Sequence, residues 1–145
     1  MQIAVADKLI VGAEKVALVV FDWDGTVMDS IGRIVSSLRS AASLSELVVP
    51  TEHEAKQIIG LSLDPAFDIL FPGITDDKRQ LMFQHYREQY MLHDTTPTPL
   101  FAGVEQVLTQ LKDNNIKLAV ATGKQRRGLA RMFAETGLEK YFDTS

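Results

Sequence analysis

The sequence predicts an α/β fold in which a parallel sheet is interrupted by a helical insertion. Two short apolar runs rich in β-branched residues, 16–21 (VALVVF) and 116–121 (IKLAVA), are typical of strands buried on both faces of a parallel sheet. Residues 31–94 between them have helical periodicity, and they far exceed a simple βαβ unit, which needs about 30 residues in all. The simplest interpretation is a discontinuous core, residues 1–30 and 95–145, with a helical unit inserted at 31–94. Residues 1–15 are assigned to no element.

Apolar spacing predicts the helices in turn. The first has the i, i+3, i+4 and i+7 pattern of an amphipathic helix, at Ile31, Ile34, Val35 and Leu38. Further helices are expected at 52–59, 65–70 and 76–91. Two prolines and a glycine in 95–103 (TTPTPLFAG) indicate a linker back to the core. A last apolar stripe predicts a helix that runs into the second strand, at Val104, Val107, Leu108 and Leu111.

Another helix is expected after the second strand. Thr122 and Gln125 have the spacing of a capping box. Lys124, Arg126 and Arg127 crowd the first turn, where an exposed cation opposes the helix macrodipole by about 0.3–1 kcal/mol. A nearby anion would offset that cost, whereas side chains that extend into water explain the same cations without a ligand.

Composition and charge exclude several classes of protein. The 145 residues are 46% hydrophobic and 23% charged, as in a folded domain rather than a disordered chain. A net charge of −4 gives no basic footprint for DNA or RNA, and the absence of cysteine excludes disulfides and Cys-ligated zinc. Residues 1–15 lack the pattern of a signal peptide, and no apolar run approaches the roughly 20 residues of a membrane helix. We therefore expect a cytoplasmic protein that binds neither nucleic acid nor membrane.

Polar residues follow both predicted strands at the point where each strand ends. Asp22 and Asp24 follow the first, and Thr122 follows the second, so neighbouring parallel strands would bring them to one crevice. Residues i and i+2 of an extended segment face the same side about 6.5–7 Å apart, so one carboxylate can attack a substrate while the other handles a proton. Gly25 permits a tight turn that presents backbone N–H groups to a ligand. Carboxylates beside an anionic substrate need a divalent cation, and oxygen ligands favour Mg²⁺.

These motifs resemble those of the haloacid dehalogenase superfamily. FDWDGTVMDS (21–30) is similar to its first motif, an apolar strand followed by D-x-D-G-T, and AVATGK (119–124) is similar to its second, an apolar strand that ends in Thr or Ser. The insertion is similar to the helical cap of the phosphoglycolate phosphatase and β-phosphoglucomutase branch. The resemblance runs from about residue 16 to the end of the chain. It implies a Rossmann-like core, a cap, Mg²⁺ as cofactor and a small phosphate ester as substrate, with phosphoglycolate as the first candidate.

The resemblance also implies a role for each site residue. Asp22 would be the nucleophile that forms an aspartyl-phosphate, and its second oxygen would bind the metal. Asp24 would protonate the leaving alcohol and then activate water, and its backbone carbonyl would bind the metal. Thr122 and the N–H of Gly123 would hold the transferring phosphoryl group. Gly25 and Lys124 are further candidates for phosphate binding.

Two features of the family are not found in the sequence, namely a lysine on a later loop and acidic residues after a still later strand. Neither Lys124 nor Asp143 stands at those positions. The chain reaches YFDTS where a third strand is expected to begin, so we expect the amino-terminal part of a longer phosphatase, inactive by itself. Two alternatives remain open. The chain is a non-catalytic, binding or self-associating fragment with an unpaired sheet edge, or it belongs to a phosphomutase.

Plain structural roles account for several neighbouring residues. The alternative to a catalytic role for the two aspartates is a solvated turn with Gly25 at its tip. Trp23 is expected to point into the core, Asp29 and Ser30 to cap the first helix of the insertion, and Gly60 to end a helix. Core packing is also expected for a set of aromatic residues at helical spacing, Phe83, Tyr86 and Tyr90. Arg33 and residues 58–63 (IIGLSL) resemble cap segments that face the active site.

Overall fold

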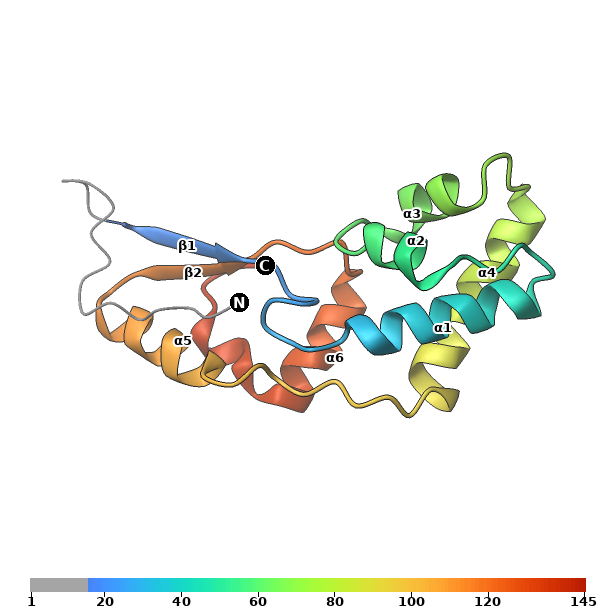
Figure 1. The fold of residues 1–145 in the computed structure, drawn as a ribbon. Coiled ribbons are helices and arrows are strands. Elements are labelled where there is room, and N and C mark those ends of the chain that lie inside the picture. The colour runs from blue at the N-terminus through green and yellow to red at the C-terminus, as the bar shows by residue number, and fades with distance from the viewer. Residues whose placement is uncertain (1–15) are drawn as a thin grey trace.

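The computed structural model describes residues 16–145, which form two lobes joined by two segments of chain (Figure 1). The unassigned residues 1–15 lie outside the described part. One lobe holds both strands with the last two α-helices, and the other holds the first four α-helices. In chain order the elements are β1 (Leu18–Phe21), α1 (Ile31–Leu44), α2 (Glu52–Gln57), α3 (Leu63–Leu70), α4 (Asp76–Glu88), the π-helix η1 (Gln89–His93), α5 (Val104–Asp113), β2 (Lys117–Val120), α6 (Arg126–Thr136) and the 3₁₀-helix η2 (Leu138–Tyr141).

The two strands are parallel neighbours, as the sequence predicted. Phe21 lies opposite Val120 in the register, and the N–H of Ala121 donates to the carbonyl of Phe21 at 2.8 Å, one step beyond β2. The chain therefore leaves both strands at the same end of the sheet, where the carboxyl ends of the strands lie. This end is where a parallel α/β sheet binds its ligands.

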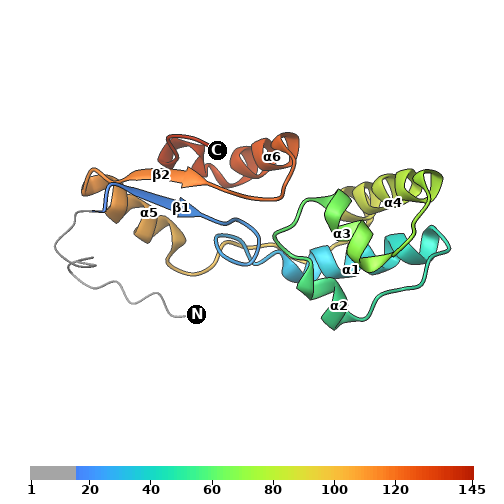
Figure 2. The ribbon, with the colours of Figure 1, turned by 90° about the horizontal axis from the view of Figure 1, so that it is seen from above.

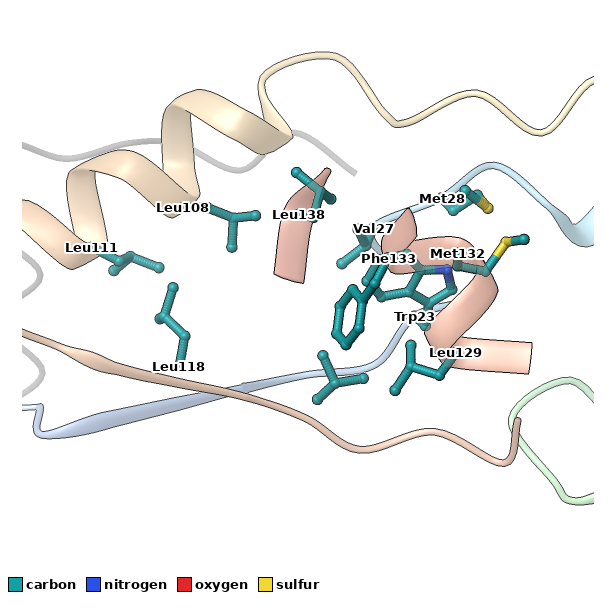
Figure 3. Packing of buried hydrophobic residues seen from close by; sticks show 11 residues of the cluster. Trp23, Val27, Met28, Leu108, Leu111, Leu118, Leu129, Met132, Phe133 and Leu138 are labelled. Atoms are coloured by element: carbon teal, nitrogen blue, oxygen red, sulfur yellow. The ribbon is translucent and has the colours of Figure 1, made fainter. Parts of the chain in front are cut away.

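One face of this sheet is packed and the other is open. Leu118 and Val120 face α5 and α6, which lie on the same side of the strands (Figure 1) and enclose Trp23, whose ring meets that of Phe133 edge-on at 5.4 Å (Figure 3). The expectation that the first strand is buried on both faces is wrong for β1 in the described chain. Leu18 and Val20 are 51% and 53% exposed, because residues i and i+2 share a face and both helices cover the opposite one.

The segment after η2 returns to the sheet, where a third strand is expected to begin. Ala119 and Thr144 form a parallel bridge, and the N–H of Val120 donates to the carbonyl of Thr144 at 3.2 Å. The carboxylate of Asp143 accepts the N–H of Leu118 at 2.9 Å and the ammonium of Lys112 at 3.1 Å. These bonds, the main-chain one first, lower the pKa of Asp143 to about 2.

The second lobe has its own apolar core. Helices α1, α2, α3 and α4 enclose Leu38, Phe67 and Met82, each fully buried. Thr51 and Glu54 form a capping box at the start of α2, and Thr75 caps α4. The predicted helices of the insertion are confirmed, although the helix expected at 76–91 changes to π geometry at Gln89. In residues 16–145 no helix combines the length and the apolar character that a bilayer crossing requires.

The two connections between the lobes run side by side. The N–H of Asp29 donates to the carbonyl of Pro99 at 2.8 Å, and that of Phe101 donates to Val27 at 3.1 Å. Segment 95–103 contains no helix, as its prolines predicted. It forms a single β-bridge, at Leu100. The paired connections join the two lobes (Figure 2), while the division into a core of 1–30 and 95–145 and a cap of 31–94 stays a prediction.

Candidate active site

The loop after β1 is built around the buried Trp23. Its carbonyl accepts the N–H groups of residues 26, 27 and 28 at 3.2, 2.9 and 3.1 Å, which folds the chain into a compact turn. Trp23 points into the core, as expected, and leaves Asp22 and Asp24 on either side of it in the chain. Gly25 has φ +79°, a value that glycine adopts readily and that suits the tight turn predicted there. Its N–H, however, donates to the carbonyl of Met28 at 2.8 Å and is therefore not presented to a ligand as expected.

The Asp24 carboxylate is held by a hydroxyl and an ammonium group. Ser30 Oγ donates to Asp24 Oδ1 at 2.6 Å, and Lys124 Nζ lies 3.0 and 3.1 Å from the two carboxylate oxygens. The side chains of Asp24 and Lys124 are only 11% and 15% exposed. This charge-assisted pair joins the loop after β1 to the loop after β2, across 100 positions of sequence.

The loop after β2 presents Thr122, Gly123 and Lys124. Thr122 Oγ1 accepts the N–H of Lys124 at 3.2 Å, so the hydroxyl and the lysine are parts of one turn. The structure thus brings Asp24 and Lys124 together, and Thr122 lies in the turn that carries Lys124. Asp22 lies at the same carboxyl end of the sheet but is exposed, and its Oδ1 accepts the N–H of Trp23 at 2.7 Å. Within residues 16–145, no hydrogen bond joins the Asp22 side chain to the other three residues.

Two interpretations of the second loop are wrong. Thr122 and Gln125 do not form a capping box, because Gln125 itself is the N-cap of α6 and Thr122 belongs to the preceding turn. Lys124 is not a solvated cation at a helix end, because it reaches back to Asp24, whereas Arg126 and Arg127 are exposed as that interpretation expected.

Two predicted caps are also corrected. Ser30 occupies the N-cap position of α1 but makes no side-chain capping bond, since its hydroxyl donates to Asp24. The position of Gly60 is not a helix C-cap, because α2 ends at Gln57 with Ile58 as its C-cap.

Gly60 and Leu61 instead press against the site. A Cβ atom at Gly123 would lie 2.4 Å from the carbonyl carbon of Leu61 and 2.7 Å from the carbonyl oxygen of Gly60. Only glycine fits at position 123 with the loop in this place. The segment 58–63 therefore closes over the second loop, on the side that its resemblance to a cap segment predicted.

A cleft of about 980 Å³ opens between the two lobes beside this contact. Asp24, Gly123 and Lys124 line it together with the first turns of α6, whereas Asp22 and Thr122 are not among its lining residues. The opposite wall is largely apolar and comes from the insertion, with Ile58, Ile59, Leu61, Phe83 and Met91 among its residues. The core side of the cleft is therefore charged, and the insertion side is largely apolar but also carries Arg87 and Glu88.

Sequence reasoning assigned Tyr90 to the core and missed its surroundings. Tyr90 is 7% exposed, as expected, but Lys124, Arg33 and Arg131 lie 5.4, 5.6 and 5.9 Å from its ring centre. Burial, with a contribution from Asp24, raises the pKa of Tyr90 to about 12, so the phenol stays neutral at physiological pH. Helical spacing predicted only the burial of Tyr90, because the three cations come from different elements.

The carboxylates supply part of a magnesium site. Mg²⁺ takes oxygen ligands and is commonly held by one or two carboxylates, waters and substrate phosphate. Asp22 and Asp24 have the required donor chemistry, and the exposed Asp22 is accessible. In the described residues, however, no group of three or more His, Cys, Asp and Glu side chains is placed to hold a metal.

The chain matches the protein-family model described as haloacid dehalogenase-like hydrolase over residues 19–145. Among curated proteins, the chain is 35% identical over 133 residues to "Probable phosphatase IndB" of Dickeya dadantii (strain 3937), covering 87% of this chain and 56% of that protein. It is 30% identical over 125 residues to "Pyrophosphatase PpaX" of Bacillus pumilus (strain SAFR-032), covering 86% and 56%.

Solved structures agree on the fold. The structure of Protein Tyrosine Kinase A (PtkA) of Mycobacterium tuberculosis matches with a TM-score of 0.73 and 30% identity, over 90% of this chain and 59% of that one. The chain spans about half the length of the curated relatives it matches. The family match includes β1 from Val19 onward, β2, both site loops and the insertion between them. This chain therefore belongs to the haloacid dehalogenase-like hydrolase family.

Proposed function

We propose that the protein is a Mg²⁺-dependent phosphomonoester hydrolase that acts on small phosphorylated metabolites through an aspartyl-phosphate. The observation that carries the proposal is the pair of Asp24 and Lys124, joined in the lining of the cleft from the tips of two neighbouring parallel strands. The names of the relatives, a phosphatase and a pyrophosphatase, support chemistry on phosphoryl groups.

In the proposed reaction Asp22 is the nucleophile and Asp24 transfers protons. A carboxylate oxygen of Asp22 attacks phosphorus, and the bond from phosphorus to the leaving oxygen breaks. Asp24, once Lys124 has left it and its carboxylate has taken up a proton from water, gives that proton to the leaving oxygen and then takes one from the water that hydrolyses the aspartyl-phosphate. Exposure of Asp22 suits attack on an entering substrate, and burial of Asp24 beside the cleft suits proton transfer to a leaving group there.

Other residues of the two loops would bind the phosphoryl group and balance its negative charge. Thr122 and the N–H of Gly123 would bind the transferring phosphoryl group, and Lys124 would leave Asp24 or share it to balance the phosphoryl charge. The Asp22 carboxylate and the Asp24 main-chain carbonyl would hold Mg²⁺, which when bound stabilises negative charge on the phosphoryl oxygens. Closure of the segment at Gly60 and Leu61 over Gly123 would keep bulk water from the site.

Residues 16–145 by themselves are expected to turn over little substrate. Only a partial metal site is present in them, and the one lysine at the site is paired with Asp24. Phosphate release by the purified 145-residue chain at the rate of the longer protein would contradict this expectation.

The test is hydrolysis of an aryl phosphate by the full-length protein that contains this chain, with and without magnesium. Asp22→Asn is expected to abolish phosphate release and the acid-stable covalent phosphate on the peptide that carries residue 22. Asp29→Asn is the matched control, because it removes an exposed carboxylate of the same loop. Unchanged turnover in Asp22→Asn would overturn the nucleophile assignment. With a labelled phosphate group on the aryl phosphate, transfer of the label to a sugar phosphate in preference to water would identify a mutase rather than a hydrolase. Transfer to a protein tyrosine would identify a kinase.

A further inference from the structure

The ring of Tyr90 is a place where side chains of the two lobes meet. It belongs to η1 in the insertion, lines the cleft and is 7% exposed. Two cations reach it from the core lobe, with Lys124 Nζ and Arg131 Cζ at 5.4 and 5.9 Å from the ring centre. Arg33 of α1 adds a third cation at 5.6 Å. A buried aromatic ring of the insertion therefore meets cations from three different elements.

Lys124 links this ring to the Asp24 carboxylate. Its Nζ lies 3.0 and 3.1 Å from the two oxygens of Asp24, and its side chain is 15% exposed. Arg131 is different, because it lies 3.5 Å from Glu135 on its own helix. An ammonium group that has lost water gains more from an aromatic face than an exposed one does. Lys124 therefore has two attractive neighbours, a carboxylate from the core and a ring from the insertion.

The ring of Tyr90, and not its hydroxyl, makes the contact with Lys124. The hydroxyl is buried and has no hydrogen-bond partner in the described chain. A buried polar group without a partner costs stability instead of adding to it. The face of the ring carries the negative part of the aromatic quadrupole and attracts a cation with or without the hydroxyl. Phenylalanine is therefore expected to serve as well as tyrosine at this position.

Contacts of η1 with the rest of the insertion fix where the ring lies. The N–H of Asp94 donates to the carbonyl of Gln89 at 2.7 Å, which is the five-residue bond of π geometry. The carboxylate of Asp94 accepts the hydroxyl of Ser37, on α1, at 3.1 Å. The segment that carries Tyr90 is thus tied to α1 at its end. A ring held in this way can determine the position of the flexible side chain of Lys124.

We infer that Tyr90 positions Lys124, because its ring, supplied by the insertion, holds the ammonium group of this core lysine at the Asp24 carboxylate. Tyr90 is a positioning residue and not a catalytic one, since it acts on the site only through Lys124. The inference rests on the proposed function in one respect, namely that Asp24 is the residue expected to transfer protons there. The lysine contact itself is a property of the chain and can be measured without a substrate.

The test measures how fast each lysine of the 145-residue chain is acetylated by a trace of acetic anhydride. Mass spectrometry of peptides gives the rate at each site, and circular dichroism checks that each variant is folded. Tyr90→Leu is expected to raise the rate at Lys124 about fivefold, which corresponds to an attraction of about 1 kcal/mol. Tyr90→Phe keeps the ring and is expected to leave the rate within about twofold of wild type.

Two controls separate this effect from a general loosening of the structure. Lys78 is held inside the insertion, where its Nζ donates to the carbonyl of Ser45 at 2.7 Å, and its rate is expected to stay unchanged in every variant. Phe83→Leu is the matched substitution, because Phe83 lines the same cleft and no cation lies over its ring in the described residues. It is expected to leave the rate at Lys124 unchanged.

Pentafluorophenylalanine at position 90 separates attraction from shielding, because it keeps the shape of the ring but reverses the charge on its face. It is expected to raise the rate at Lys124 as Tyr90→Leu does, and it decides the question alone if Tyr90→Leu unfolds. A rate equal to that of Tyr90→Phe overturns the inference, as does a rise at Lys78 that matches the rise at Lys124. Either result leaves the hydrolase proposal standing, since no turnover is measured. Conversely, unchanged turnover in Asp22→Asn would leave the contact between Tyr90 and Lys124 in place.

Discussion

At the scale of single residues, the pair of Asp24 and Lys124 determines the state of the site. Both side chains are mostly removed from water, and each would be costly to leave there without the other. Ser30 completes the set by donating to the same carboxylate. The acid expected to move protons is therefore fixed in orientation by a hydroxyl from the start of α1 and a cation from the other loop. Movement of α1 with the insertion would carry Ser30 with it.

Lys124→Met tests this pairing. We expect the free energy of unfolding to fall by about 1–3 kcal/mol, because the substitution leaves the Asp24 carboxylate buried without its cation. Denaturant unfolding can be followed by the fluorescence of Trp23, the one tryptophan of the sequence. Lys56→Met is the control, since its pair with Glu52 is 56% and 66% exposed and should change stability by less than about 1 kcal/mol. Equal effects of the two substitutions would mean that the Asp24 pair adds no more than a surface contact.

At the scale of elements, the two lobes meet at a close main-chain contact as well as through the side chains around Tyr90. The carbonyls of Gly60 and Leu61 lie against Gly123, between the strand that ends at Val120 and the helix that begins at Arg126. The connections between the lobes are themselves hydrogen-bonded at Asp29 and Phe101. Paired linkers and one short loop at Gly123 therefore connect the insertion to the core lobe.

Gly123→Ala is expected to push the Leu61 main chain away from position 123. The added methyl group would overlap the Leu61 main chain, and we expect a loss of about 1–3 kcal/mol in stability together with faster proteolysis of segment 58–63. Gly128→Ala is the matched control, because its Cβ would meet only the Lys124 side chain at 3.7 Å. Since Gly128 lies in α6, that variant should be more stable by up to about 1 kcal/mol. Wild-type stability and proteolysis in Gly123→Ala would show that the loop is free to withdraw at no cost.

At the scale of the whole molecule, the uncovered face of the sheet is the main exposed apolar feature of the core lobe. Leu18 and Val20 on β1 project from the face opposite α5 and α6. In the described chain β1 pairs with β2 alone, so its other edge is also without a strand. Exposed apolar faces and unpaired edges favour association between copies.

Self-association of the 145-residue chain is therefore the expected behaviour. We expect its average mass in sedimentation experiments to rise with protein concentration, and Val20→Lys to reduce that rise by placing a charge on the exposed face. Ile69→Lys should behave as wild type, because Ile69 is comparably exposed, at 59%, but lies on α3 in the other lobe. A wild-type chain that stays monomeric over the same range would contradict the expectation.

The sequence by itself determined the features that depend on local pattern. Apolar runs placed both strands, the 3.6-residue period placed the helices, and the prolines of 95–103 placed a linker. The two site loops were found because a strand end and its next few residues are close in the chain. The position of Trp23 in the core follows from the same alternation.

Only the tertiary structure decided which of these residues meet. The pairing of Lys124 with Asp24 depends on the register of β1 and β2. The capping box expected at Thr122 and Gln125 was wrong because the Thr122 hydroxyl belongs to the turn before α6, whose N-cap is Gln125. The contact of Leu61 with Gly123 and the cations around Tyr90 depend on how the insertion packs on the core. Local patterns record which face of an element is buried, but they do not record which distant element will cover it.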